Sequence, residues 1–176
     1  MESYTWIVII FGILLILFLL PLFFINRLLL QANKIEIRFD PIKTYIEEKK
    51  ELLDNIALFI KNNIKNEEEL IKKIAETTNE LKNIKDAKDG IPALKKSEEL
   101  EINLNKLEEI NSKLTENKEY QSLKTKLKEN QNRINYAKDS YNEEVTNYNN
   151  YKKKKILSIL NKLFSFQEYT YYKKEL

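Results

Sequence analysis

Hydrophobic and polar positions divide the chain into two unlike parts. Residues 6–25 (WIVIIFGILLILFLLPLFFI) contain no charged side chain, and a helix of this length spans about 30 Å, the hydrocarbon thickness of a bilayer. The residues that follow are polar, lysine-rich and periodic. The pattern therefore predicts a membrane-spanning helix from Trp6 to Ile25, with Gly12 and Pro21 inside it, followed by polar helices.

Two other interpretations of the apolar segment fit less well. A cleaved signal peptide has a basic leader and small residues at its cleavage site, whereas residues 1–5 carry no Lys or Arg and no Ala-x-Ala pattern follows the segment. A buried core helix rarely stays apolar on every face over such a length. An internal proline such as Pro21 is also better tolerated in a membrane helix than in a soluble one. We therefore expect a retained anchor in contact with the lipid bilayer.

The distribution of positive charge predicts the orientation of this anchor. None of the 30 Lys and Arg residues precedes Arg27, whereas Arg27, Lys34 and Arg38 follow the apolar segment closely. Positive charge accumulates on the cytoplasmic side of membrane helices. We therefore expect a single-pass protein of the cell membrane, with the short leader of residues 1–5 outside and the remainder in the cytoplasm.

Apolar residues after the anchor recur at spacings of three and four, which is typical of helices with one apolar face. The four stripes are Ile42, Ile46, Leu53, Ile56, Ile60 and Ile64; Leu70, Ile74, Thr77, Leu81 and Ile84; Leu94, Leu100, Leu104, Leu107 and Leu114; and Tyr120, Leu123, Leu127, Ile134, Ala137, Tyr141, Val145 and Tyr148. The predicted fold is all-α: an N-terminal transmembrane helix followed by an antiparallel four-helix bundle with long helices.

Helix-breaking residues predict where the segments of the chain begin and end. Residues 26–41 continue the membrane helix to Asp40-Pro41, where proline disfavours helical geometry and predicts a kink or a short break. The bundle then occupies residues 42–164, and residues 165–176 form a C-terminal tail. Within the bundle, Asn66 and Glu69 have the spacing of a capping box. Residues 88–92 (KDGIP) form the clearest break.

The amino-acid composition excludes several kinds of binding and catalytic site. Charged residues make up 32% of the chain, yet the net charge is only +3, so the charges are interleaved as on solvated helix faces and not gathered as in a nucleic-acid binder. The chain has no Cys and no His, which excludes disulfides, thiolate chemistry and Glu-x-x-His metal sites. Acidic runs at 67–69 and 98–99 fit first-turn and solvent-face charges. We expect no enzyme activity, no cofactor, no metal and no nucleic-acid partner.

A repeated Tyr-Asn pair is the sharpest local pattern. Tyr141-Asn142 and Tyr148-Asn149 are seven residues apart and lie on one helix face. One hypothesis is a surface for a protein partner, supported by the eight of ten tyrosines that follow Glu119. The other, which the intervening Val145 favours, is a polar layer where the fourth helix packs on the first. Asn130, also on a stripe, is interpreted as a polar residue that sets the helix register, in preference to a binding residue.

The C-terminal region is a candidate membrane-surface contact. The basic run consists of Lys152, Lys153, Lys154 and Lys155, and each lysine near an anionic leaflet contributes about 1 kcal/mol. The following segment, residues 156–166, places apolar side chains that include Leu163 and Phe164 opposite a polar face. The alternative is that this apolar face packs on the first helix around Leu30 and Ile37.

In the last predicted helix the residues also resemble a known family. The resemblance rests on Asn132-Arg133-Ile134, Ala137, Tyr141-Asn142, Val145, Tyr148-Asn149 and Leu163-Phe164-x-Phe166, and upstream on Asn26-Arg27-Leu28, Leu52-Leu53-x-Asn55-Ile56 and Leu114-x-x-Asn117. These positions are similar to the LemA family. The resemblance implies an outside N-terminus, one membrane helix and a cytoplasmic helical bundle, and it brings no catalytic residues. Lys155-Ile156 replaces the family's Phe-Pro, so we expect the fourth helix to extend further here.

The leading functional hypothesis is a membrane-anchored, non-enzymatic scaffold or adaptor that presents a helical bundle to an unknown protein partner at the cytoplasmic face of the membrane. One alternative is an accessory subunit of a membrane enzyme or transport complex. A second is a membrane-remodelling protein that self-assembles into a homo-oligomer through the bundle.

Overall fold

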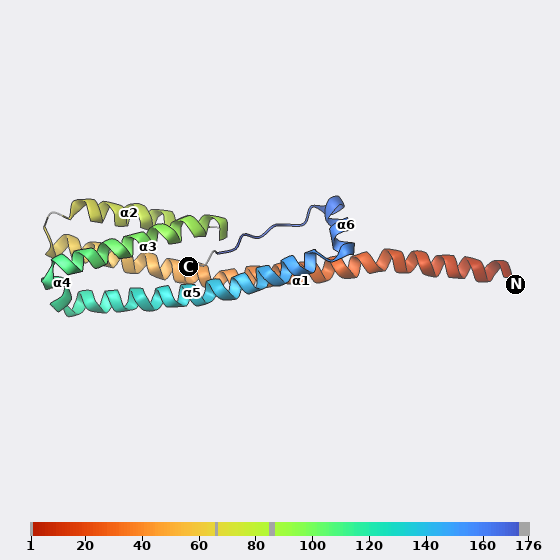
Figure 1. Ribbon diagram of the computed structural model, residues 1–176, viewed down its shortest axis with the longest axis horizontal. Coiled ribbons are helices and arrows are strands. Elements are labelled where there is room, and N and C mark those ends of the chain that lie inside the picture. Colours follow the sequence, from red (N-terminus) through yellow and green to blue (C-terminus); the bar gives the residue numbers. More distant parts are fainter. Residues whose placement is uncertain (1, 66, 85–86, 173–176) are drawn as a thin grey trace. The chain divides into compact units, whose positions relative to one another are not determined.

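The computed structural model describes residues 2–65, 67–84 and 87–172, and the regular secondary structure in these ranges is helical throughout (Figure 1). The helices are α1 (Glu2–Asn63), α2 (Glu68–Lys82), α3 (Ala87–Ile110), α4 (Ser112–Glu116), α5 (Lys118–Lys152) and α6 (Lys155–Phe164). The all-α prediction is confirmed. The described residues form two compact units, one from residues up to 37 with 143–169, the other from residues within 38–142 with 170–172.

Helix α1 continues through Pro41 without a break, so the short break predicted at Asp40-Pro41 is wrong, and the kink predicted as its alternative stays a prediction. A proline inside a helix costs about 3 kcal/mol. Phe39 and Ile42, which flank it, are both buried in the second unit, and each such side chain contributes about 1.5–3 kcal/mol. Burial on both sides of the proline therefore outweighs its local cost.

The predicted stripes form the core of the second unit. Its buried residues include Ile42, Ile46, Leu53, Ile56 and Ile60 of α1; Leu70, Ile74 and Leu81 of α2; Leu94, Leu100, Leu104 and Leu107 of α3; and Tyr120, Leu127, Ile134 and Ala137 of α5. Ile84 lies beyond the end of α2. The proposed cap residue Asn66 is outside the described residues.

Interactions between helices follow a regular order within this unit. The rings of Phe39 and Tyr141 lie 5.9 Å apart, and those of Phe59 and Tyr120 lie 5.5 Å apart. Between these two contacts, the Asn130 side chain donates to the Tyr45 carbonyl oxygen at 2.9 Å. Residue numbers thus rise along α1 as those of their α5 partners fall.

The break predicted at residues 88–92 is wrong, because α3 already begins at Ala87. Pro92 lies in the second turn of this helix, where its missing N–H costs one intrahelical hydrogen bond. Gly90 has no positive φ, and its role is a close approach: a Cβ there would lie 2.5 Å from the Tyr172 hydroxyl oxygen. The glycine is therefore explained by tertiary packing and not by a turn.

The long C-terminal helix ends earlier than expected. Helix α5 stops at Lys152, and Lys154 has an extended backbone (φ −57°, ψ 137°) before α6 begins. The prediction that this helix continues past residue 155 is therefore wrong. The interruption accompanies burial of Leu157 and Leu160 in the first unit, worth about 1.5–3 kcal/mol each against about 1 kcal/mol for each lost hydrogen bond.

The end of α6 has a left-handed cap. Ser165 has φ 48° and ψ 66°, and its N–H donates to the Asn161 carbonyl oxygen at 2.9 Å. The Asn161 side chain accepts a further hydrogen bond from the Phe166 N–H at 2.8 Å. Such caps satisfy the free groups at a helix C-terminus, and residues 166–172 that follow are not helical.

Candidate functional site

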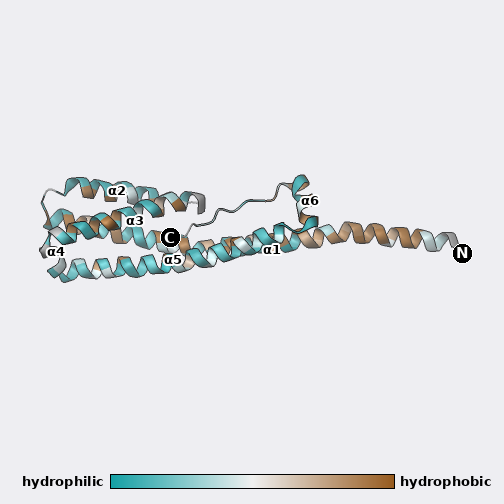
Figure 2. Cartoon of the chain, viewed as in Figure 1, coloured by the Kyte–Doolittle hydropathy of each residue, from teal (hydrophilic) through white to brown (hydrophobic). Residues whose placement is uncertain are grey.

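The predicted membrane span lies entirely within α1, and most of its side chains are exposed. The N-terminal part of this helix is hydrophobic on the visible face, whereas the other helices are mixed (Figure 2). None of its most apolar window is buried against the rest of the chain, Trp6 is exposed, and a Cβ at Gly12 would contact nothing. Pro21 and Ile25 are half-buried. This helix is long and apolar enough to span a membrane, and its exposure differs from that of a core helix.

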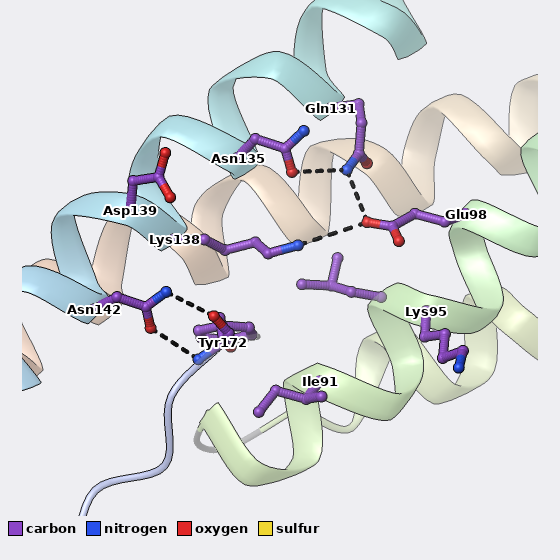
Figure 3. A pocket seen from close by; sticks show the side chains of 10 residues that line it. Ile91, Lys95, Glu98, Gln131, Asn135, Lys138, Asp139, Asn142 and Tyr172 are labelled. Atoms are coloured by element: carbon purple, nitrogen blue, oxygen red, sulfur yellow. Dashed lines mark hydrogen bonds and ion pairs between the residues drawn. The ribbon is translucent and has the colours of Figure 1, made fainter. Parts of the chain in front are cut away.

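The first Tyr-Asn pair binds the backbone of residues 170–172. Tyr141 is buried, and its hydroxyl donates to the Thr170 carbonyl oxygen at 3.1 Å. The Asn142 amide pairs with the Tyr172 backbone in both directions: it donates to the carbonyl oxygen at 2.6 Å and accepts from the N–H at 2.8 Å (Figure 3). The Tyr172 ring also contacts those of Tyr141 and Phe39.

The second Tyr-Asn pair has a similar environment in the first unit. Tyr148 is buried, and its hydroxyl donates to the Gln167 carbonyl oxygen at 2.9 Å. Its ring packs edge-on against that of Tyr169, and Asn149 is half-buried. Both tyrosine hydroxyls thus donate to carbonyl oxygens of the segment after α6. The hypothesis of a partner surface at these four residues stays a prediction.

The four lysines differ in their surroundings. Lys152 is partly buried, and its ammonium donates to the Phe166 carbonyl oxygen at 3.2 Å, while the other three are exposed. In α6 the side chains of Ile159, Leu163 and Phe164 are exposed. The suggested alternative partners, Leu30 and Ile37, are themselves exposed, whereas Leu160 on the same face of α6 is buried. Membrane contact and packing on the first helix therefore both stay predictions for this face.

A buried lysine is the most unusual charged group of the second unit. Lys49 of α1 is fully buried, with its ammonium 2.6 Å from Glu101 Oε1 and 2.5 Å from Gln131 Oε1. Burial lowers the pKa of Lys49 from its ordinary 10.5, and the Glu101 carboxylate offsets this only in part. The arrangement connects α1 with α3 and α5 through a single side chain.

A cavity of about 600 Å³ is lined in part by Gln131, the hydrogen-bond partner of Lys49 (Figure 3). Glu98 accepts a hydrogen bond from Gln131 Nε2 at 3.0 Å and lies 3.6 Å from the Lys138 ammonium. Ile91 and Leu94 of α3 and Tyr172 give the cavity an apolar side. Glu98 and Lys138 thus form an ion pair within the lining. No group of metal-binding side chains occurs among the residues that the structure describes.

In the first unit, the environment of the tyrosines changes their acidity. Burial, together with the nearby Glu36 carboxylate, raises the pKa of Tyr169 to about 12. Burial likewise raises the pKa of Tyr148, with a smaller contribution from Glu168. Both hydroxyls therefore stay protonated at neutral pH, and that of Tyr148 donates to the Gln167 carbonyl oxygen.

A comparison with protein-family models shows the family of this chain. The family model described as LemA matches residues 38–175. The chain belongs to the LemA family. The match covers the C-terminal part of α1 and all helices after it, and it includes the residues that suggested the LemA resemblance except Asn26-Arg27-Leu28. Comparison with curated proteins gives no match.

Sequence reasoning missed two features of this LemA family protein. Lys49 was not singled out, although the first stripe skips from Ile46 to Leu53, and a helix face needs a residue at the intervening turn. The role of Tyr172 had no local signal, because its partners Asn142 and Gly90 are distant along the chain. Sequence periodicity identifies which positions are buried, and only the fold identifies what they contact.

Proposed function

We propose that this LemA family protein is a single-pass, membrane-anchored, non-enzymatic scaffold that presents helices to protein partners at the cytoplasmic face of the membrane. One observation carries the proposal: α1 is a single helix that supplies both an exposed apolar segment and buried core residues of the second unit. The same helix therefore serves as anchor and as part of the presented domain.

The presented domain is proposed to be an antiparallel four-helix bundle of α1, α2, α3 and α5. The falling order of α5 partners along α1 supports opposite directions for these two helices. A salt bridge between Glu80 and Lys96 links α2 to α3, and Lys49 with Glu101 links α1 to α3. Short connections such as residues 83–86 favour neighbouring helices of opposite direction.

The cytoplasmic placement of this domain follows from charge. Arg27, Lys34 and Arg38 come after the apolar segment, and no Lys or Arg precedes it. The absence of Cys and His from the sequence removes the thiolate nucleophile and the commonest general base, which favours a scaffold over an enzyme.

The exposed apolar face of α6 is proposed to lie in the membrane interface. Ile159, Leu163 and Phe164 have no cover within the described part of the first unit, and three exposed lysines precede or begin the helix. An apolar face flanked by lysines is typical of helices that lie in the plane of an anionic leaflet. Because the same unit contains the apolar segment of α1, the bilayer is the occupant proposed for this face.

Site-specific crosslinking tests the scaffold proposal. A photo-crosslinking amino acid replaces Tyr136, which is 78% exposed on α5, and the full chain is irradiated in intact cells. We expect crosslinks to one or a few distinct proteins. The same amino acid at Phe18, exposed in the apolar segment, is the matched control and should capture mainly lipid. Crosslinks to this chain alone would favour self-assembly, and no protein adduct at any exposed α5 position would contradict the proposal.

A further inference from the structure

A second hollow lies in the first unit, between α1 and the C-terminal part of α5. It has a volume of about 320 Å³. Gln31 and Lys34 line it from α1, and Asn147, Asn150, Tyr151 and Lys154 line it from the other side. The lining combines side-chain amides with two ammonium groups, so it offers hydrogen-bond donors to a ligand that carries acceptors.

Positive charge dominates this hollow. Lys34 and Lys154 are exposed there, against one carboxylate, that of Glu144. The Lys154 ammonium lies 4.5 Å from the centre of the Tyr151 ring, and the Arg27 guanidinium lies 5.9 Å from it. Cation–π contacts of this kind hold cationic groups over an aromatic face, so the Tyr151 ring gathers two cations at the edge of the hollow.

Two buried polar atoms of the lining are without a hydrogen-bond partner in the described structure. One is the hydroxyl of Tyr151, a residue only 7% exposed, and the other is Gln31 Oε1. A buried polar atom without a partner destabilises the fold, because it has lost its hydrogen bonds to water without replacement. A ligand that accepts from the tyrosine hydroxyl and donates to the glutamine oxygen removes both costs.

The position along α1 identifies the source of such a ligand. Gln31 follows Ile25, the last residue of the apolar segment, by six residues, or about 9 Å of helix. Leu29 and Leu30, just before it, are still apolar and exposed. The headgroup layer is about 5–8 Å thick, and helical side chains point back toward the helix N-terminus. The side chains of Gln31 and Lys34 therefore reach the level of lipid headgroups.

We propose that this hollow binds the headgroup of an anionic glycerophospholipid that carries a free hydroxyl, such as phosphatidylglycerol. The phosphodiester oxygens accept from the Tyr151 hydroxyl and from the ammonium groups of Lys34 and Lys154. The headgroup hydroxyl donates to Gln31 Oε1. The inference rests on the membrane anchor of the proposed function and adds a specific lipid to it.

Native mass spectrometry of the full chain tests this site. The protein is released from mixed micelles that contain equal amounts of phosphatidylglycerol and phosphatidylcholine, and the lipids retained are counted. We expect one retained phosphatidylglycerol and at least tenfold less phosphatidylcholine. Tyr151→Phe leaves the charge and the ring in place and removes one hydrogen bond to a charged group, which should weaken retention about tenfold.

A pair of matched variants separates a built site from general attraction. Asn147→Asp places a carboxylate in the hollow and should abolish the preference for phosphatidylglycerol over phosphatidylcholine. Asn132→Asp makes the same charge change at an exposed position of α5 in the other unit and should leave this preference unchanged. Far-UV circular dichroism confirms that each variant is folded. Retention that is equal for both lipids, or unchanged in Tyr151→Phe and Asn147→Asp, would overturn the site.

Two further experiments distinguish this proposal from binding of a soluble ligand and from failure of the membrane anchor. Free glycerophosphoglycerol, added in excess, should not displace the lipid; displacement at equal concentration would mean that a soluble phosphodiester is the ligand and would overturn the lipid assignment. Fractionation of cells reports on the anchor separately. Parent chain found outside the membrane fraction would refute the proposed function, whereas membrane-bound chain without lipid preference would refute only the headgroup site.

Discussion

Replacing Lys49 tests the interior of the helical domain directly. Lys49→Met keeps most of the side-chain volume and removes the charge, so packing changes little. The variant leaves the Glu101 carboxylate and Gln131 Oε1 without the ammonium that binds them. The measured quantity is the free energy of unfolding of a fragment of residues 38–176, which covers the matched LemA region.

The expected magnitude follows from the burial of the two partners. Removing one partner of a fully buried ion pair costs about 3–5 kcal/mol. Lys49 is fully buried, but the Glu101 side chain is 22% exposed, and water reduces its cost when unpaired. We therefore expect a loss of about 2 kcal/mol. With a urea dependence of about 2 kcal/mol per molar, the unfolding midpoint should fall by about 1 M.

Changing both partners should reverse most of this loss. Lys49→Met combined with Glu101→Met removes both charges together, and apolar replacement of a buried pair is often neutral or stabilising. Equilibrium urea unfolding followed by circular dichroism measures all three variants and the parent. A single Lys49→Met variant as stable as the parent would refute the ion pair as a feature of the folded core.

The pH dependence of the same pair gives an independent check. Because burial lowers the pKa of Lys49 below 10.5 in the folded chain, the folded chain loses this proton before the unfolded chain does. Between the lowered pKa and 10.5 the unfolded chain binds more protons, so the contribution of Lys49 to the free energy of unfolding rises with pH. The stability gap between the parent and Lys49→Met should therefore widen across this window. A gap that narrows would contradict the lowered pKa.

Three further predictions concern other parts of the chain. Leu107→Asp places an unpaired charge at a buried stripe position and should abolish cooperative unfolding of the same fragment, because a cost of several kcal/mol approaches the total stability. Gly90→Val should lower the free energy of unfolding by about 1–3 kcal/mol, since its Cβ would meet the Tyr172 hydroxyl at 2.5 Å. In the full chain, Trp6→Phe removes the native tryptophan and Phe164→Trp places one in α6. If α6 lies in the interface, lipids with brominated acyl chains should quench the fluorescence of this tryptophan.

Each of these predictions has a matched control. Ile102→Asp adds a charge to an exposed position of the same helix α3 and should unfold nearly as the parent does. Gly90→Val should cost little more once Tyr172→Ala has removed the obstructing ring. The fluorescence of Tyr136→Trp, exposed on α5 and placed in the same Trp6→Phe chain, should not be quenched. Equal effects in a variant and its control would contradict the structural reason given for that variant.

The periodic part of the sequence predicted much of the fold. Spacings of three and four identified Ile46, Leu104 and Ile134 as core residues, and all three are buried. Such stripes are informative because burial of many side chains on one helix face is itself the main stabilising contribution. The apolar segment was equally clear, because its length and lack of charge have few alternatives.

Local breaking signals were less informative. Pro41 and Gly90 both suggested interruptions, and both lie inside helices. Proline and glycine report the preference of a few residues, worth about 1–3 kcal/mol, and burial of neighbouring side chains exceeds it. Contacts of distant residues, such as Asn142 with Tyr172, leave no periodic trace. The hollow at Tyr151 was not predicted for the same reason, since its two sides are more than a hundred residues apart.

The central claim is that α1 crosses the membrane once and places the helical domain in the cytoplasm. Because the chain has no cysteine, single cysteines report their location without background labelling. Tyr4→Cys and Asn132→Cys substitute exposed residues before and after the apolar segment, and a membrane-impermeant thiol reagent is added to intact and to lysed cells. We predict that Tyr4→Cys is labelled in both and Asn132→Cys only after lysis. Labelling of Asn132→Cys in intact cells would contradict the claim.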